Sequence, residues 1–171
     1  MEDLKALYVD ELRDLLDAEK QLMKALPKMA EASSASELRS GFEHHLEQTK
    51  NHAKRIRRIL EALGQPAKGK KCKGMQGIVN EGKQILEEGS PGPVKDAGII
   101  SAAQRVEHYE IAAYGAVREF AQLLGENEAV SLLGETLEEE KETDQKLTEL
   151  AHTVNQQALG HSAEKSQSIG A

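Results

Sequence analysis

The sequence predicts an all-α protein in which four long helices form a bundle and one long crossover carries a short extra helix. The 171-residue chain is rich in Ala, Leu, Glu, Lys and Gln, all of which favour helices. Aromatic residues make up only 3% and there are four prolines, a composition that argues against a β-sandwich or barrel. Apolar residues also recur every three or four positions over four long stretches, as on helices with one packed face.

The first long helix is predicted over residues 4–32. Its packed face carries apolar residues spaced by three and four, with Glu19 in the same stripe: Leu12, Leu15, Leu22, Leu26 and Met29. A serine-rich break follows, and Ser34 with Glu37 three residues later predicts a capping box that opens the second helix. That helix is predicted to end at Gly64, a C-cap glycine that is followed closely by Pro66.

The second and third long helices are separated by a connection of about 30 residues. It contains a basic loop over residues 67–73 and a short amphipathic helix over residues 75–86. Pro93 lies where the third helix should begin, because proline is favoured in the first turn of a helix. We expect that helix to run to residue 124.

The fourth long helix is predicted to begin near Asn127, which can cap it. Its apolar periodicity fades after about residue 156, and the remaining residues are mostly small and polar. The sequence therefore predicts a bundle domain over residues 1–156 and a polar, disordered tail over residues 157–171.

The connection lengths predict how the helices are arranged. Short turns make the first and second helices antiparallel, and likewise the third and fourth. The long connection can cross the length of the bundle, so that the third helix runs parallel to the second. One long crossover in a four-helix bundle is the ferritin-like arrangement.

Several ionisable residues lie on the apolar stripes of these helices. Glu107 and Glu110 are three residues apart, and therefore neighbours on one face of the third helix. A carboxylate in apolar surroundings is costly unless it is protonated, paired or bound to a metal. The candidate metal ligands on the four stripes are Glu19, His45, His52, Glu107, Glu110, Glu140 and Asp144.

This set resembles the ligand set of carboxylate-bridged dinuclear sites, which take one Glu from each of two helices and a Glu-x-x-His pair from each of the others. Here the second helix offers Thr49 and His52, and the fourth offers Glu140 and Thr143, so each keeps one half of the pair. Carboxylates with one or two imidazoles suit Fe or Mn. We therefore expect two Fe or Mn ions as the cofactor.

Each of these residues also has a structural interpretation. Glu19 could lie at the edge of its stripe with its carboxylate in water, as most Glu residues do. His45 and His52 could be hydrogen-bonded histidines of the core. On the fourth helix, Glu139 is the alternative to Glu140 as the inward residue, because the two are adjacent in an acidic run.

The charge and the single cysteine limit the partners and the compartment. The net charge is -7, with 29 acidic and 22 basic residues, which argues against a nucleic-acid partner. Cys72 is the only cysteine, so no intrachain disulfide can form, and a reducing compartment, the cytoplasm, is expected. There is no apolar stretch of about 18 residues and no basic, apolar leader at the N-terminus, so no membrane association is expected.

The third helix carries more apolar residues than one bundle face can bury: Ile99, Ile100, Ile111 and Phe120. The short helix of the crossover adds a second amphipathic surface. We therefore expect a homodimer with a largely apolar interface and two-fold symmetry. The sequence does not indicate a redox partner.

Five segments resemble one known family, the YciE/YciF family of bacterial ferritin-like stress-response proteins. They are DAEKQL (17–22), HLEQT (45–49), KCKGM (71–75), VEHYEI (106–111) and TLEEE (136–140). The resemblance covers residues 1–155. It implies a cytoplasmic, dimeric four-helix bundle that is linked to the stress response and has a dinuclear metal site.

Two functions follow from these observations. In the first, a ferritin-like, stress-associated protein binds a dinuclear Fe or Mn centre in the bundle core and handles iron, O2 or peroxide. In the second, a non-enzymatic helical stress protein keeps the same inner polar residues as a metal-free hydrogen-bonded network. The residues alone leave both open, and they do not decide whether the protein is an enzyme.

Overall fold

The computed structural model describes residues 3–68 and 70–168, with side chains up to residue 160. Its helices are α1 (Leu4–Ala32), α2 (Ser36–Ala62), α3 (Lys73–Glu87), α4 (Pro93–Leu123) and α5 (Asn127–Ser168). No strand occurs among these described residues. The prediction of an all-α protein with four long helices and one short helix is confirmed.

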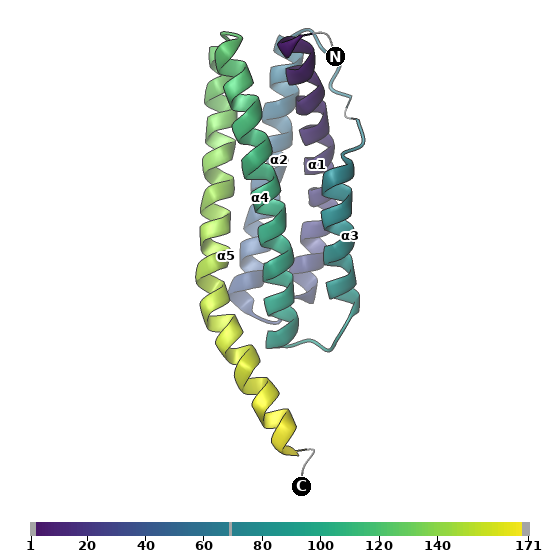
Figure 1. Cartoon of the computed structure of the whole chain (residues 1–171), viewed down its shortest axis with the longest axis vertical. Helices are drawn as coiled ribbons and strands as arrows, with labels where there is room; N and C mark the ends of the chain where they lie inside the picture. Colours follow the sequence, from purple (N-terminus) through teal and green to yellow (C-terminus); the bar gives the residue numbers. More distant parts are fainter. Residues whose placement is uncertain (1–2, 69, 169–171) are drawn as a thin grey trace.

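The four long helices form an elongated bundle, and α3 lies along one side of it (Figure 1). Helices α1 and α2 are an antiparallel pair, and so are α4 and α5. The crossover that contains α3 returns along the bundle, so α4 runs in the same direction as α2. The predicted single long crossover is therefore present.

The two residues that lead into α2 are held in a different way from the one predicted. Helix α2 begins at Ser36, and its N-cap residue makes no side-chain cap hydrogen bond. The backbone N–H groups of Ser34 and Ala35 instead donate to the two carboxylate oxygens of Asp96, each at 2.8 Å. The predicted capping box of Ser34 and Glu37 is wrong, because a buried carboxylate from α4 already satisfies these donors.

The crossover helix is held closely against α1 and α4. The Cys72 N–H donates to Asp17 at 2.9 Å, and the Cys72 thiol lies 3.1 Å from the Tyr109 hydroxyl. A Cβ atom at Gly74 would lie 2.7 Å from the Tyr109 ring, so only glycine allows this approach.

Because α3 packs on α4, it covers part of the apolar surface that was expected to need a second protomer. Ile99 and Ile100 are 1% and 2% exposed, in one core cluster with Met75 of α3. Ile111 and Phe120 are partly buried against the other core cluster. The excess apolar residues of α4 are thus largely accommodated within one chain.

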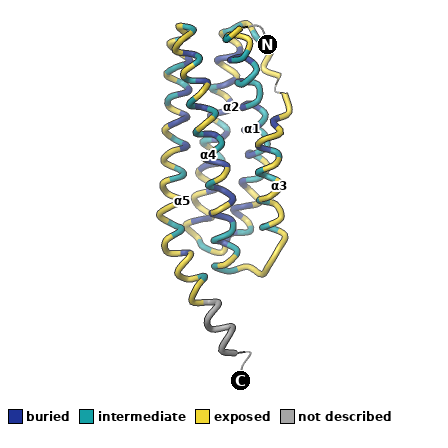
Figure 2. Tube along the Cα trace, in the orientation of Figure 1, coloured by how far each residue is buried: buried dark blue, intermediate teal, exposed yellow. Residues whose placement is uncertain are grey.

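Helix α5 extends beyond the other helices at one end of the bundle (Figure 1). The backbone is helical to Ser168, where the sequence predicted a disordered tail from residue 157. Helix formers such as Gln156, Gln157 and Ala158 continue the helix, and no proline stops it. After Val154 no residue up to 160 is buried, as Figure 2 shows, and residues 169–171 of the predicted tail lie outside the described residues.

The apolar core is divided into two clusters, one toward each end of the bundle. One includes Tyr8, Leu12 and Ile56, and the other includes Leu26 and Phe42. Apart from Asp96 near the start of α4, the buried acidic residues and histidines of the long helices fall at the boundary between these clusters. The bundle therefore encloses a polar layer between two apolar ones.

Within the described residues, none of the helices is long and apolar enough to cross a membrane.

Candidate metal centre

Six of the seven predicted site residues meet in the polar layer. Each is at most 2% exposed: Glu19 from α1, His45 and His52 from α2, Glu107 and Glu110 from α4, and Glu140 from α5. Their positions follow from helix periodicity, because each occupies a stripe position that would otherwise hold an apolar core residue. Four carboxyl groups and two imidazoles are thereby enclosed in one bundle.

These six residues form two overlapping groups. Within each group, one ligand atom from every residue lies within 4.8 Å of the ligand atoms of the others. The four-residue group contains His45, Glu107, Glu110 and Glu140, and the three-residue group contains Glu19, His52 and Glu140. Glu140 belongs to both, so its two carboxylate oxygens can serve two adjacent positions. Either group has the residue types and the proximity needed to hold a metal ion.

Most ligand atoms of the cluster have no hydrogen-bond partner. Among the described side chains, ten buried nitrogen or oxygen atoms lack one, and eight of the ten belong to these six residues. Both oxygens of Glu110 and both of Glu140 are in this set. Buried polar groups are almost always satisfied, so such a concentration of unpaired atoms is compatible with a site that takes up a cation or protons.

The surroundings shift the pKa values of these groups strongly. Burial, reinforced by neighbouring carboxylates, raises the pKa of Glu107 and Glu110 well above its usual value. Burial also raises the pKa of Glu19 to about 8. Without a cation, the cluster therefore retains protons that exposed glutamates lose near pH 4.5.

The two histidines respond to burial in opposite ways. Burial lowers the pKa of His45. Burial also disfavours the charged form of His52, but the nearby carboxylates of Glu140 and Glu19 outweigh this effect and raise its pKa to about 9. His52 is therefore charged in the metal-free protein at neutral pH and would have to lose a proton to bind a metal.

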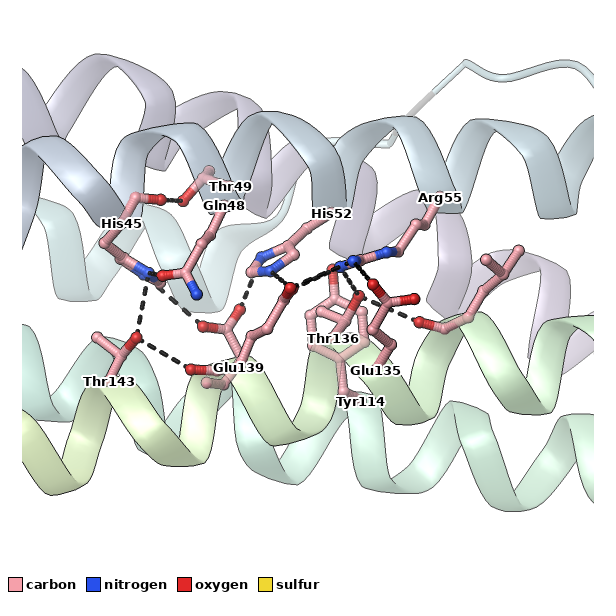
Figure 3. A network of polar contacts seen from close by, with 12 residues as sticks. His45, Gln48, Thr49, His52, Arg55, Tyr114, Glu135, Thr136, Glu139 and Thr143 are labelled. Carbon is pink, nitrogen blue, oxygen red and sulfur yellow. Dashed lines mark hydrogen bonds and ion pairs between the residues drawn. The ribbon is translucent and has the colours of Figure 1, made fainter.

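His52 is oriented by a carboxylate outside the cluster. Its Nε2 lies 2.7 Å from a carboxylate oxygen of Glu139 (Figure 3). Its Nδ1 lies 3.1 Å from Oε1 of Glu140. Arg55 in turn donates to both oxygens of Glu139. Partial burial alone would raise the pKa of Glu139, but the hydrogen bonds from Arg55 and His52 outweigh it and lower the pKa. Glu139 is therefore an ionised carboxylate that accepts the Nε2 proton. When His52 loses its second proton, as metal binding requires, Glu139 keeps the remaining proton on Nε2 and the Nδ1 lone pair faces Glu19 and Glu140.

His45 presents its other nitrogen to the cluster. Its Nε2 lies 3.4 Å from Glu107 Oε1 and 3.7 Å from Glu140 Oε2. Its Nδ1 lies 3.4 Å from both the Gln48 amide oxygen and the Thr143 hydroxyl oxygen. Because Thr143 donates its own proton to the Glu139 carbonyl, both oxygens can accept from Nδ1–H, which leaves Nε2 unprotonated. Neutral groups orient this ring, whereas an anion orients His52.

Tyr114 completes the inner layer beside Glu19. Its hydroxyl is fully buried and donates to Glu19 Oε1. Its ring packs edge-on to His52, with the ring centroids 6.2 Å apart. This polar role could have been suggested by the position of Tyr114 on the same stripe of α4 as Glu107 and Glu110.

Asp144 is the one predicted residue that the structure does not bring into the cluster. It is 21% exposed, and its oxygens lie 3.4 Å from His108 Nε2 and 3.5 Å from the Gln104 amide nitrogen. Asp144 is one helical turn beyond Glu140, on the same stripe. At this turn the side chain contacts residues of α4 that lie toward the surface of the bundle and not in its core. The alternative between Glu139 and Glu140 is resolved as well: Glu140 is fully buried, and Glu139 is 26% exposed.

A buried carboxylate–histidine cluster within a four-helix bundle with one crossover defines a ferritin-like protein. Residues 3–159 match a family described as Domain of unknown function (DUF892), and the chain belongs to this family. It is also 43% identical over 160 residues to Protein YciF of Escherichia coli, covering 92% of this chain and 96% of that one. The resemblance to the YciE/YciF family is thereby confirmed.

Solved structures agree with this assignment. The E. coli stress protein YciF matches with a TM-score of 0.88 at 42% identity, covering 91% of this chain and 99% of that one. YcfI of Rhodopseudomonas palustris matches with a TM-score of 0.83 at 37% identity over 86% of this chain and 94% of that one. A dodecameric thioferritin of Bacteroides fragilis matches with a TM-score of 0.72 at 17% identity over 92% and 91% of the two chains, which extends the ferritin-like fold to a more distant protein.

Proposed function

We propose that this protein binds a dinuclear Fe or Mn centre in its polar layer and that it handles iron, O2 or peroxide there. The observation that carries the proposal is the set of eight unpaired ligand atoms on six buried residues. When bound, such a centre supplies redox chemistry toward O2 or peroxide.

Charge balance supports two divalent ions. Four buried carboxylates carry four negative charges when ionised, and at an effective dielectric constant of about 20, two charges about 4 Å apart repel by roughly 4 kcal/mol. Two divalent cations would neutralise this cluster, provided that both imidazoles are neutral. The outer partners of His45 and His52 accept a hydrogen bond from the outer nitrogen of each ring, so that the lone pair of the neutral ring is turned inward.

The two metal positions would differ in their ligands. The four-residue group would hold one ion and the three-residue group the other, with Glu140 shared between them. Tyr114 fixes one oxygen of Glu19 by hydrogen bonding. The three-residue group offers fewer ligand residues, so we expect its ion to be held less tightly.

The direct test is elemental analysis of the protein purified without chelator. We expect about two Fe or Mn atoms per chain, in keeping with the dinuclear sites of ferritin-like bundles. Loading with Fe(II) or Mn(II) under anaerobic conditions, followed by gel filtration, guards against loss during purification. If the loaded protein also retains no metal, the non-enzymatic function with a metal-free polar network replaces this proposal.

Glu139→Ala should weaken metal binding although Glu139 is not a ligand in either group. Without this carboxylate, His52 is free to change its tautomer and its ring orientation. Loss of such an outer partner typically costs about 10- to 100-fold in metal affinity. Competition with a chelating dye should reveal the loss in only one of the two binding steps.

Glu135→Ala is the matched control for that experiment. Glu135 also pairs with Arg55, but it is 58% exposed and does not touch His52. Its removal should leave both binding steps nearly unchanged. Equal losses in the two variants would contradict the orienting role of Glu139.

We also propose a homodimer. Its support is an apolar stripe on the outer face of α4: the exposed residues Ala112 and Ala116, the partly buried Phe120, and Leu123, which is 66% exposed. These residues recur every three or four positions, so they share one helix face that a second copy could cover about a two-fold axis.

Light scattering at micromolar concentration should give the dimer mass, and Leu123→Glu should shift it toward the monomer. A monomer mass for the wild-type protein would overturn the proposal.

A cytoplasmic location and a role in the stress response complete the proposed function. The free Cys72 suits a reducing compartment. The stress association is supported by the similarity to the E. coli stress protein YciF. We propose neither a nucleic-acid nor a membrane partner.

A further inference from the structure

An apolar groove lies between α1, α3 and α4, away from the candidate metal centre. It has a volume of about 210 Å³. Its apolar lining comes from all three helices and includes Leu22, Met29, Ile78, Leu86, Ala102 and Val106. None of the candidate metal ligands contributes to it. Figure 1 shows α3 lying along this side of the bundle. The groove lies where α3 packs beside α1 and α4.

The charge of the groove is opposite to that of the whole protein. Lys24, Lys28 and Lys83 line it, and among the described residues no acidic side chain does. The chain as a whole has 29 acidic and 22 basic residues. Lys83 has an ion-pair partner in Glu87, at 3.3 Å, whereas Lys24 and Lys28 make no ion pair with any described side chain. Two uncompensated cations therefore lie beside an apolar surface.

The shape of the groove is elongated. On α1 the lining extends from Gln21 to Met29, and on α3 from Ile78 to Leu86. At 1.5 Å per residue, each wall is about 12 Å long. The two walls therefore match in length. Such a groove fits an extended chain better than a compact or branched molecule.

We propose that this groove binds an anionic amphiphile, a medium-length alkyl chain with a carboxylate head group. The alkyl chain lies along the apolar walls, where its burial provides the main driving force. The carboxylate pairs with Lys24 and Lys28 at the rim. The methylene stems of these lysines can also cover the chain while their ammonium groups remain in water.

The proposal is tested by titrating decanoate, below its micelle-forming concentration, into the full-length isotope-labelled protein. We expect saturable chemical-shift changes that centre on the backbone amides of Ala25, Gly82 and Ala102. Butyrate, which has the head group but only a short chain, should bind far more weakly. Decyltrimethylammonium, which has the chain but a cationic head group, should also bind more weakly than decanoate.

Two variants separate the groove from the rest of the surface. In Gly82→Leu the new Cβ lies 3.6 Å from the Ala102 Cβ, an ordinary contact, and the side chain fills the groove. Gly77→Leu is its control on the same helix, because Gly77 does not line the groove and its added Cβ meets nothing within 4 Å. We expect Gly82→Leu to abolish saturable decanoate binding and Gly77→Leu to preserve it.

The charge requirement has its own test. Replacing both Lys24 and Lys28 by Gln should weaken decanoate binding about threefold to tenfold, as expected for two exposed ion pairs. It should not weaken the binding of decyltrimethylammonium, because the repulsion of the cationic head group is removed. A control with Lys5 and Lys54 replaced by Gln removes the same charge elsewhere. Non-saturable shifts, shifts outside the groove, or equal binding of all three ligands would overturn the proposal. So would an oligomer that dissociates in Gly82→Leu without any decanoate binding, since the groove would then be an interface between copies.

Discussion

Glu140→Ala is expected to remove both metal ions from the protein, lowering the metal content from about two ions per chain to almost none. Glu140 is the residue that the four-residue and three-residue groups have in common. Both of its oxygens are buried and have no hydrogen-bond partner among the described residues. By the same reasoning, Glu19→Ala should remove only the ion of the three-residue group. Elemental analysis of the loaded variants distinguishes two, one and no ions per chain.

Glu138→Ala is the matched control for Glu140→Ala. Glu138 is on the same turn of α5 but is 68% exposed and pairs with Lys141. It should retain the wild-type metal content. Thermal unfolding with and without metal provides a second measurement, because an ion at 100 times its dissociation constant stabilises the folded state by about 2.7 kcal/mol. If Glu140→Ala keeps the wild-type stoichiometry and the metal-dependent stabilisation, Glu140 is not a shared ligand.

The inward-facing ligand candidates could be predicted from the sequence because helix periodicity determines which residues face the core. Glu19, Glu107 and Glu110 lie on their stripes in register with apolar residues, and all three are buried. The same reasoning is weaker toward the edge of a stripe. Asp144 is on the stripe of α5, yet it turns toward His108 and Gln104. Periodicity gives the face of a helix, but not how its neighbours cover each turn.

Contacts between helices could not be predicted in this way. Arg55 and Glu139 orient His52 from helices α2 and α5, and their sequence separation of 84 residues leaves no local pattern. Asp96 replaces the predicted capping box at the start of α2 for the same reason, since it is 62 residues from Ser34. Such contacts depend on the helix register across the bundle, which one sequence does not define.

The polar layer has a consequence for stability, because it interrupts the apolar core. Apolar side chains at the positions of Glu19, Glu107 and Glu110 would join the two core clusters into one. A fold that keeps buried, unpaired carboxyl groups is less stable without a ligand than the same fold with an apolar layer. If the layer exists to bind metal, stability and metal binding must respond to substitution in opposite directions.

Glu110→Met should therefore stabilise the metal-free protein while it lowers the metal content. Neither oxygen of Glu110 has a hydrogen-bond partner among the described residues, and the residue is fully buried. An unsatisfied buried polar group costs about 1–3 kcal/mol, and an unbranched Met side chain fits a similar volume. Chemical denaturation in the presence of a chelator should show an increase of about that size in the free energy of unfolding.

The pH dependence provides a sharper form of the same prediction. Burial raises the pKa of Glu110 well above the value of 4.5 that it has in the unfolded chain. Above pH 4.5 Glu110 therefore binds more protons in the folded protein than in the unfolded chain, and its contribution to stability falls as the pH rises toward the folded-state pKa. Glu110→Met removes this contribution, so its advantage over the wild-type protein should be larger at pH 8 than at pH 5. Glu138→Met, an exposed control, should show neither effect. If Glu110→Met destabilises the metal-free protein at both pH values, Glu110 is a satisfied member of a polar network, and the metal-free function becomes the better explanation of the polar layer.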